Sequence, residues 1–275
     1  MEISFSTMFF HDHPLDRIFQ AAGLSGADTV EFWPETPDWW LDGMPMNRLT
    51  RSLEKYRFRS PLSVHAPVLD LNPCSINPDV VEVSTEWVIR SLDLAAALGA
   101  GVCTFHPGRR TSKRPPTETD YRRLDRLLNR IAPHAGRLPV KMAIENMEPQ
   151  VNALLSTPGE VFRILDEWDW LWLTLDACHV AGQGQGVLDE YLDGAGDRIA
   201  NVHLSGASGS VMHQPVSGDR WADTALESLE GAGYRGLITL EINDLSLGEP
   251  LSYDEKVTIV RTDVERVRRY FSSSL

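Results

Sequence analysis

The sequence has few cysteines, no long apolar run and no basic segment at its N-terminus. Only three of its 275 residues are cysteines, Cys74, Cys103 and Cys178, and no CxxC spacing joins two of them. An odd number of scattered thiols does not build a disulfide framework, so we expect reduced cysteines. No stretch approaches the roughly 20 apolar residues of a membrane span, and Met1–Phe5 lacks the basic start of a signal peptide. We expect a cytoplasmic protein with no membrane partner.

Positive charge is also scarce. The chain has 26 Lys and Arg against 39 Asp and Glu, which gives a formal net charge of −13. Broad binding to a nucleic-acid backbone needs a cationic face, so this balance favours a small-molecule substrate over nucleic acid. The dense basic run, Arg109-Arg110 with Lys113-Arg114, is expected to be a solvated loop, with contact to a phosphate group as the alternative.

Short β-rich segments alternate with amphipathic segments along the whole chain. The expected strands are Glu2–Met8, Asp28–Trp33, Leu62–His65, Val102–His106, Lys141–Asn146, Trp172–Asp176, Ile199–Leu204 and Leu237–Ile242. Apolar residues recur at helical spacing between them. The clearest expected helices are Pro78–Leu98, Thr117–Ala135, Thr157–Trp168 and Tyr253–Phe271.

This alternation predicts a parallel sheet, because parallel neighbours need crossover helices. Eight such units predict a single (β/α)₈ TIM barrel, with residues 1–275 as one domain. A doubly wound open sheet is the alternative architecture. That sheet typically carries a Gly-rich phosphate loop after its first strand, and no GxGxxG stands there.

Residues that can bind metal follow the predicted strands. They are His65, His106, Glu145, Asp176 with His179, His203 and Glu241. All strand carboxyl ends of a barrel open on one face, so we expect these side chains to converge. Each of them alone has an ordinary interpretation, such as a hydrogen bond in a pocket or a helix cap. Several buried carboxylates together cost free energy unless a cation balances them, so the set predicts a divalent metal site.

The predicted ligands of one divalent ion are Glu145, Asp176, His203 and Glu241. This oxygen-rich set suits Mn²⁺, Mg²⁺ or Co²⁺, and Zn²⁺ is also compatible. Further histidines are expected to contact the substrate or to hold a second metal ion, which would favour Zn²⁺: His65, His106, His179 and His213.

Six short motifs resemble the xylose isomerase-like TIM barrels, a superfamily that includes sugar isomerases, ketose 3-epimerases and endonuclease IV. In chain order they are Val64-His65-Ala66-Pro67, His106-Pro107-Gly108, Ile144-Glu145-Asn146, Asp176-Ala177-Cys178-His179, His203-Leu204 and Leu240-Glu241. The motifs come in the order of the family and span most of the chain.

The isomerase and epimerase branches imply that the four predicted ligands hold one metal ion, and that Glu145 and Glu241 also form the acid–base pair. A metal ion on a carbonyl and its neighbouring hydroxyl acidifies the C–H bond between them. One carboxylate removes the proton and the other returns it from the opposite face. The leading expectation is therefore isomerisation or epimerisation of a sugar or sugar phosphate.

Departures from the family pattern favour an alternative. Ketose epimerases of the family carry an Arg shortly after the strand-seven His, whereas Ser205–Met212 contains no Arg or Lys. The alternative is a metal-dependent hydrolase of an amide or phosphodiester, as in the cobamide-remodelling branch. The endonuclease branch has an Asp-x-His pair, but Val211-Met212 precede His213 here, so DNA repair is not expected.

Three tryptophans follow the second predicted strand: Trp33, Trp39 and Trp40. They are expected to form an aromatic pocket wall for a large ligand, which would suit the hydrolase. A hydrophobic plug over the barrel mouth and a contact between the subunits of a homodimer are the alternatives.

Overall fold

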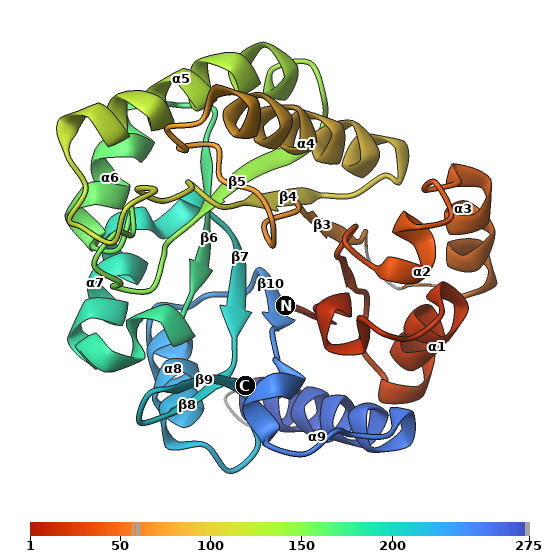
Figure 1. The fold of residues 1–275 in the computed structure, drawn as a ribbon. Helices are drawn as coiled ribbons and strands as arrows, with labels where there is room; N and C mark the ends of the chain where they lie inside the picture. Colours follow the sequence, from red (N-terminus) through yellow and green to blue (C-terminus); the bar gives the residue numbers. More distant parts are fainter. Residues whose placement is uncertain (57, 59–60, 273–275) are drawn as a thin grey trace.

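Eight parallel strands form a nearly closed barrel, and helices surround it on the outside (Figure 1). The structure is a computed structural model and describes residues 1–56, 58 and 61–272. The sheet order is β1-β10-β7-β6-β5-β4-β3-β2, and an isolated bridge between Ser6 and Glu31 links its two edge strands. The barrel strands are β1 (Glu2–Phe5), β2 (Glu31–Phe32), β3 (Ser63–His65), β4 (Val102–Phe105), β5 (Lys141–Glu145), β6 (Trp172–Asp176), β7 (Ile199–Leu204) and β10 (Leu237–Leu240).

Helices follow the strands in regular alternation, as a (β/α)₈ barrel requires. They are α1 (Leu15–Ser25), α2 (Pro37–Trp40), α3 (Met46–Lys55), α4 (Pro78–Ala97), α5 (Glu118–Ala135), α6 (Pro158–Glu167), α7 (Gln185–Ala195), α8 (Arg220–Gly231) and α9 (Tyr253–Ser272). Short 3₁₀ helices and one hairpin complete the fold: η1 (Thr7–Phe10), η2 (Cys178–Gln183), η3 (Gly196–Arg198), η4 (Asp244–Leu247), β8 (Gly206–Ser208) and β9 (Val211–Gln214).

The sequence predictions of fold and helices are confirmed. The four clearest helices agree with the structure to within one residue at each end, and Thr157 caps α6 with Glu160 at the third position. Several strands are shorter than predicted. After Phe5 the chain turns into η1, because the Ser6 side chain accepts a hydrogen bond from the Met8 amide. Strand β2 covers only Glu31–Phe32 of the predicted Asp28–Trp33.

The interior of the barrel contains a polar layer rather than only branched apolar side chains. Ser4 and Thr239 lie 2.6 Å apart between their hydroxyl oxygens, and Thr239 donates to Asn201 Oδ1 at 3.0 Å. Across the barrel, the hydroxyls of Thr104 and Thr174 are 2.8 Å apart. All of these side chains are fully buried. A TIM barrel usually fills this space with Val, Ile and Leu, so the polar layer needs an explanation, which the adjoining site supplies.

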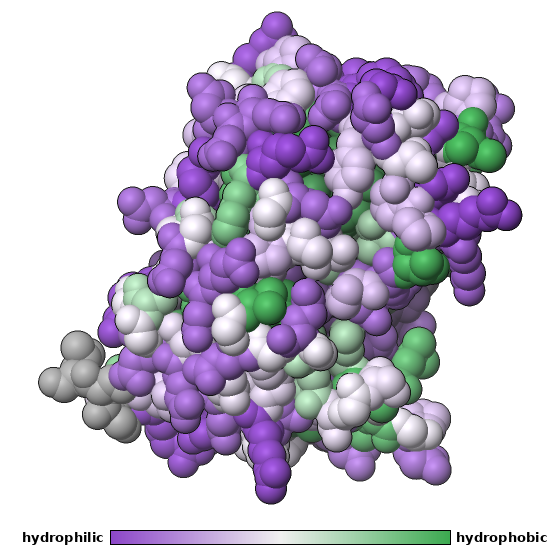
Figure 2. Space-filling view, turned by 90° about the vertical axis from the view of Figure 1, so that its left-hand side faces the viewer, coloured by the Kyte–Doolittle hydropathy of each residue, from purple (hydrophilic) through white to green (hydrophobic). Residues whose placement is uncertain are grey.

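The outer faces of the helices are mainly polar. Figure 2 shows the side of the molecule that carries α6 and α7, and hydrophilic residues cover most of it, with small apolar spots between them. The inward faces of these helices carry Val161, Ile164 and Leu188, which pack in the main core. Among the described residues, no helix has the length and apolar character that crossing a lipid bilayer would need.

We predict that Gly108→Ala destabilises the loop after β4. Gly108 has a φ of +84°, and a Cβ there would lie 2.8 Å from Asn72 Oδ1 and 3.0 Å from the Cys74 amide nitrogen. Backbone strain and this close approach should lower the free energy of unfolding by about 1–3 kcal/mol, measured by urea denaturation. Gly101→Ala is the control, because its Cβ would meet nothing within 4 Å. Equal stability of the two variants would contradict the prediction.

Candidate metal centre

The four predicted metal ligands lie together at the carboxyl ends of neighbouring strands. Glu145 ends β5, Asp176 ends β6, His203 lies near the end of β7 and Glu241 directly follows β10. One ligand atom of each residue lies within 4.8 Å of the others. His203 Nδ1 is 2.7 Å from Glu241 Oε2 and 3.5 Å from Glu145 Oε1. We call these four residues the central group.

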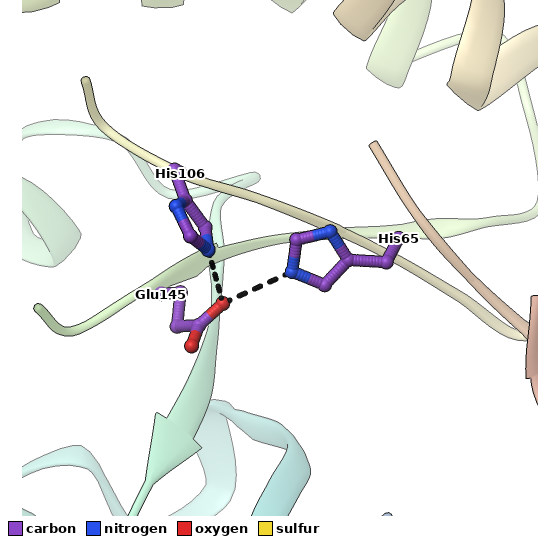
Figure 3. A group of neighbouring side chains, drawn as sticks. All are labelled: His65, His106 and Glu145. Atoms are coloured by element: carbon purple, nitrogen blue, oxygen red, sulfur yellow. Dashed lines mark hydrogen bonds and ion pairs between the residues drawn. The ribbon is translucent and has the colours of Figure 1, made fainter. Parts of the chain in front are cut away.

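Two further groups of the same kind adjoin the central group. The first group is His65, His106 and Glu145, and the third group is Asp176, His179 and His213. Figure 3 shows that both imidazoles of the first group approach the same Glu145 oxygen, Oε2, at 3.2 Å from His65 and 3.0 Å from His106. Glu145 belongs to the first and central groups, and Asp176 belongs to the central and third groups. The three groups therefore form one continuous cluster.

One ring nitrogen of His65 bonds to a backbone carbonyl, and this determines whether the other nitrogen carries a hydrogen. His65 Nδ1 lies 2.8 Å from the Ala66 carbonyl oxygen, which can only accept, so Nδ1 carries the hydrogen. In a neutral ring, Nε2 then presents a lone pair to the Glu145 carboxylate. Two acceptors repel each other at this distance unless a proton or a cation lies between them.

The same arrangement recurs in the other two groups. His179 Nδ1 lies 2.8 Å from the Asn146 carbonyl oxygen, while its Nε2 faces Asp176 Oδ2 at 3.6 Å. His203 Nε2 lies 3.1 Å from Glu31 Oε1, while its Nδ1 faces the central carboxylates. Metal-binding histidines typically donate their second ring N–H to a carbonyl or carboxylate in this way. Each group thus contains one histidine oriented as a metal ligand.

Buried polar atoms in the central group test whether a cation fits there. Among the described residues, Asp176 Oδ2, His203 Nδ1 and Glu241 Oε2 are buried and form no hydrogen bond of good geometry, although His203 Nδ1 and Glu241 Oε2 face each other at 2.7 Å. The second Asp176 oxygen, by contrast, accepts from the Cys178 and His179 amides at 2.7 and 3.0 Å. Buried polar atoms without partners are costly. These atoms and their chemical types fit a divalent ion, which would bind all three.

The pKa values of the cluster reflect its crowded charges. Burial alone would raise the pKa of Glu145, but the charges of His106 and His203 hold it well below its ordinary value. Burial alone would lower the pKa of His203, but Glu31, Glu241 and Glu145 raise it well above its ordinary value. Burial raises the pKa of Asp176. Protons and a divalent cation therefore compete for the same cluster of bases.

Glu31 supports the centre from inside the barrel. It is fully buried on β2 and accepts from Asn201 Nδ2 at 3.1 Å and from Ser63 Oγ at 3.3 Å. Asn201 belongs to the polar layer, so that layer helps to fix Glu31, and Glu31 in turn fixes the ring of His203. Glu31 and His203 thus form a buried ion pair across the barrel.

The three predicted pocket-wall tryptophans have different positions. The Trp33 ring stacks on His65, with 4.1 Å between ring centroids and 5° between planes. Trp39 is buried in the main core against Phe32, which corrects its assignment to a pocket wall. Trp40 is half-buried and stacks on Trp87 of α4. Only Trp33 therefore contacts the cluster, where it fixes the ring plane of His65.

The comparisons with known proteins agree with this fold. Residues 19–270 match the xylose isomerase-like TIM barrel family. An uncharacterized protein of Methanocaldococcus jannaschii is 30% identical over 96% of this chain and 97% of its own length. A probable endonuclease 4 of Thermoplasma volcanium is 26% identical over 68% of each chain. The structure of D-allulose 3-epimerase from Methylomonas sp. with D-allulose aligns over 98% of this chain and 97% of its own, with a TM-score of 0.80 and 19% identity. That structural likeness shows the fold alone.

We predict that the protein binds more than one divalent ion per chain. After saturation with Zn²⁺ and dialysis, His106→Ala should hold about one ion fewer than the unchanged protein, because the central group does not use His106. Inductively coupled plasma mass spectrometry measures the content. A single ion per chain in both proteins would contradict the assignment of the first group.

We also predict that Glu31→Gln weakens metal binding without touching a ligand. Loss of the carboxylate that orients His203 should lower the affinity for Zn²⁺ about 10- to 100-fold, measured by competition with a chelating dye. Asp120→Asn is the matched control, because Asp120 is also a buried carboxylate but caps α5 away from the cluster. An equal loss of affinity in both variants would indicate a general loss of stability instead.

Proposed function

The chain belongs to the xylose isomerase-like TIM barrel family, and from this premise we propose that it is a metal-dependent hydrolase of small phosphate esters. The observation that carries the proposal is the sharing of Glu145 and Asp176 among three adjacent ligand groups. An isomerase of the one-metal type needs only the central group. The first and third groups add four histidines to the ligands of the central group.

The geometry of Glu145 favours a bridging role over a role in proton transfer. Its Oε2 faces His65 and His106, and its Oε1 faces His203. A carboxylate whose two oxygens are both engaged is a poor general base. It is well suited to join two cation sites.

Divalent ions held by these residues would supply a water of lowered pKa and would stabilise charge on a phosphoryl group. The residues that would hold these ions are shielded from bulk solvent on the barrel side: His65 and His203 are fully buried, and Glu145 nearly so. Trp33 stacks on the imidazole of His65, and Glu31 pairs with that of His203, so both rings are held in a fixed orientation. Imidazole nitrogens combined with carboxylate oxygens suit Zn²⁺, with Mn²⁺ and Co²⁺ as further candidates and Mg²⁺ less well matched.

The comparisons support phosphate ester chemistry in part. Three of the curated relatives are named probable endonuclease 4, and endonucleases cleave phosphodiester bonds. The net charge of −13 still disfavours a nucleic-acid polymer as the substrate. A small organic phosphate reconciles these two observations.

Sugar epimerisation is the second candidate function. Glu145 and Glu241 approach the same nitrogen of His203 from β5 and from the end of β10, as a two-carboxylate proton transfer would use. Several solved structures with the same fold are sugar epimerases. The larger corrinoid-type ligand has less support, because Trp39 and Trp40 pack away from the cluster.

We predict that His106→Ala separates the two candidate functions. The Zn²⁺- or Mn²⁺-loaded protein should hydrolyse bis(p-nitrophenyl) phosphate, and this variant should lower kcat/KM roughly 100-fold, because the first group loses a ligand. Release of p-nitrophenol measures the reaction. His134→Ala is the control, because His134 lies in α5 and belongs to none of the three groups.

The epimerase would give a different pattern. It would exchange hydrogen at the carbon next to the carbonyl of a ketose with solvent deuterium, which NMR detects. That exchange would survive His106→Ala, because the central group remains complete. Such exchange, together with no phosphate ester cleavage, would overturn the proposed hydrolase.

A further inference from the structure

A cavity of about 310 Å³ opens beside the first and third groups. His106 and His179, one histidine from each group, lie in its lining. One wall is apolar and comes from the loop between β3 and α4, with Val68 and Leu71 among its residues. A second wall comes from the loop after β5 and includes Met147 and Glu148. The cavity thus adjoins the cluster and is large enough for one small organic molecule.

The apolar wall is held in place by hydrogen bonds to its backbone. Glu35 accepts from the Val68 and Leu69 amides at 2.9 and 3.1 Å. Asn72, in the same loop, joins it to the loop after β4: its Oδ1 accepts from the Arg109 amide at 3.0 Å, and its Nδ2 donates to the Arg109 carbonyl at 2.9 Å. The wall is therefore built before any ligand binds.

The wall from the loop after β5 is also joined to the loop after β4. The Arg110 amide donates to the Asn152 carbonyl at 3.0 Å, and Asn152 Nδ2 donates back to the Arg110 carbonyl at 2.8 Å. A bridge between Arg109 and Ala153 lies beside them. The backbone of Arg109 is thus fixed between both walls of the cavity.

The side chains of the two neighbouring arginines differ. Arg110 donates to Ser112 Oγ at 3.1 Å and to the Pro115 carbonyl at 2.6 Å, so its guanidinium stabilises its own loop. Arg109 lines the cavity, and among the described residues its guanidinium has no hydrogen-bond or ion-pair partner. The carboxylate of Glu148, on the other wall, accepts from Gln150 Nε2 at 3.0 Å instead.

We propose that this cavity binds an organic phosphate, with Arg109 on the phosphate and an aromatic or aliphatic group against Val68 and Leu71. This inference rests on the proposed hydrolase, for which it names the substrate class. A planar guanidinium donates two parallel hydrogen bonds to phosphate oxygens. In a chain with a net charge of −13, a cation without a carboxylate partner next to a cluster of metal ligands selects for an anion. The apolar wall selects for the aromatic or aliphatic substituent of the phosphate ester.

Binding of phenyl phosphate tests the proposal separately from catalysis. Isothermal titration calorimetry with the Zn²⁺-loaded protein should give a dissociation constant about tenfold higher for Arg109→Gln than for the unchanged protein. Arg109→Lys should recover part of the loss. Leu71→Ala should weaken phenyl phosphate more than methyl phosphate, because only the phenyl group needs the apolar wall. Metal content measured on each variant shows that the cluster is intact.

Lys113→Gln is the matched control, because it removes the same charge from the same basic run but does not line the cavity. Equal weakening by Lys113→Gln, unchanged binding by Arg109→Gln or no binding to the unchanged protein would each overturn the proposal. Arg109-dependent binding of phenyl phosphate without cleavage of any phosphate ester would support the site and contradict only the hydrolase.

Discussion

The structure depends on a set of buried acceptors that face one another at one end of the barrel. Among the described residues, Glu31, Glu145, Asp176 and Glu241 pair with no Lys or Arg, and their charged partners are imidazoles. Burying several carboxylates this close together costs free energy unless protons or metal ions balance them. The fold is therefore less stable with these carboxylates unbalanced, and a bound cation is the simplest way to balance their charge.

The rest of the barrel is arranged around this constraint. Strand ends bring the ligands to one face, but their orientation comes from a second set of contacts: carbonyl oxygens behind His65 and His179, and a carboxylate behind His203. The polar layer of Asn201 and Thr239 continues this support into the barrel. Side chains that would normally fill the interior with apolar packing are thus replaced by hydrogen-bonding groups, because a buried Glu needs donors.

The sequence predicted the barrel and the meeting of the central ligands, because both follow from periodic patterns and from the rule that parallel strands end on one face. The sequence did not predict that Glu145 and Asp176 each belong to two of the ligand groups. Spacing cannot reveal that one Glu145 oxygen faces His65 and His106 while the other faces His203 and His179. Glu31 lies within a strand, so no strand-end signal marked its pairing with His203. Trp40 stacks on a residue of α4 that is distant in sequence, a contact that local pattern does not encode.

Charge connects the site to the rest of the molecule. A chain with a net charge of −13 repels anions at long range, more strongly at low ionic strength. An anionic substrate can therefore bind only where positive charge is concentrated, and divalent ions in the three groups would concentrate it at the barrel mouth. The guanidinium of Arg109 adds a fixed positive charge at the edge of the same region, whereas Arg110 is committed to its own loop. Because the chain as a whole carries a net negative charge, discrimination between charged and neutral ligands falls to this small region, and the apolar loop beside it discriminates by shape.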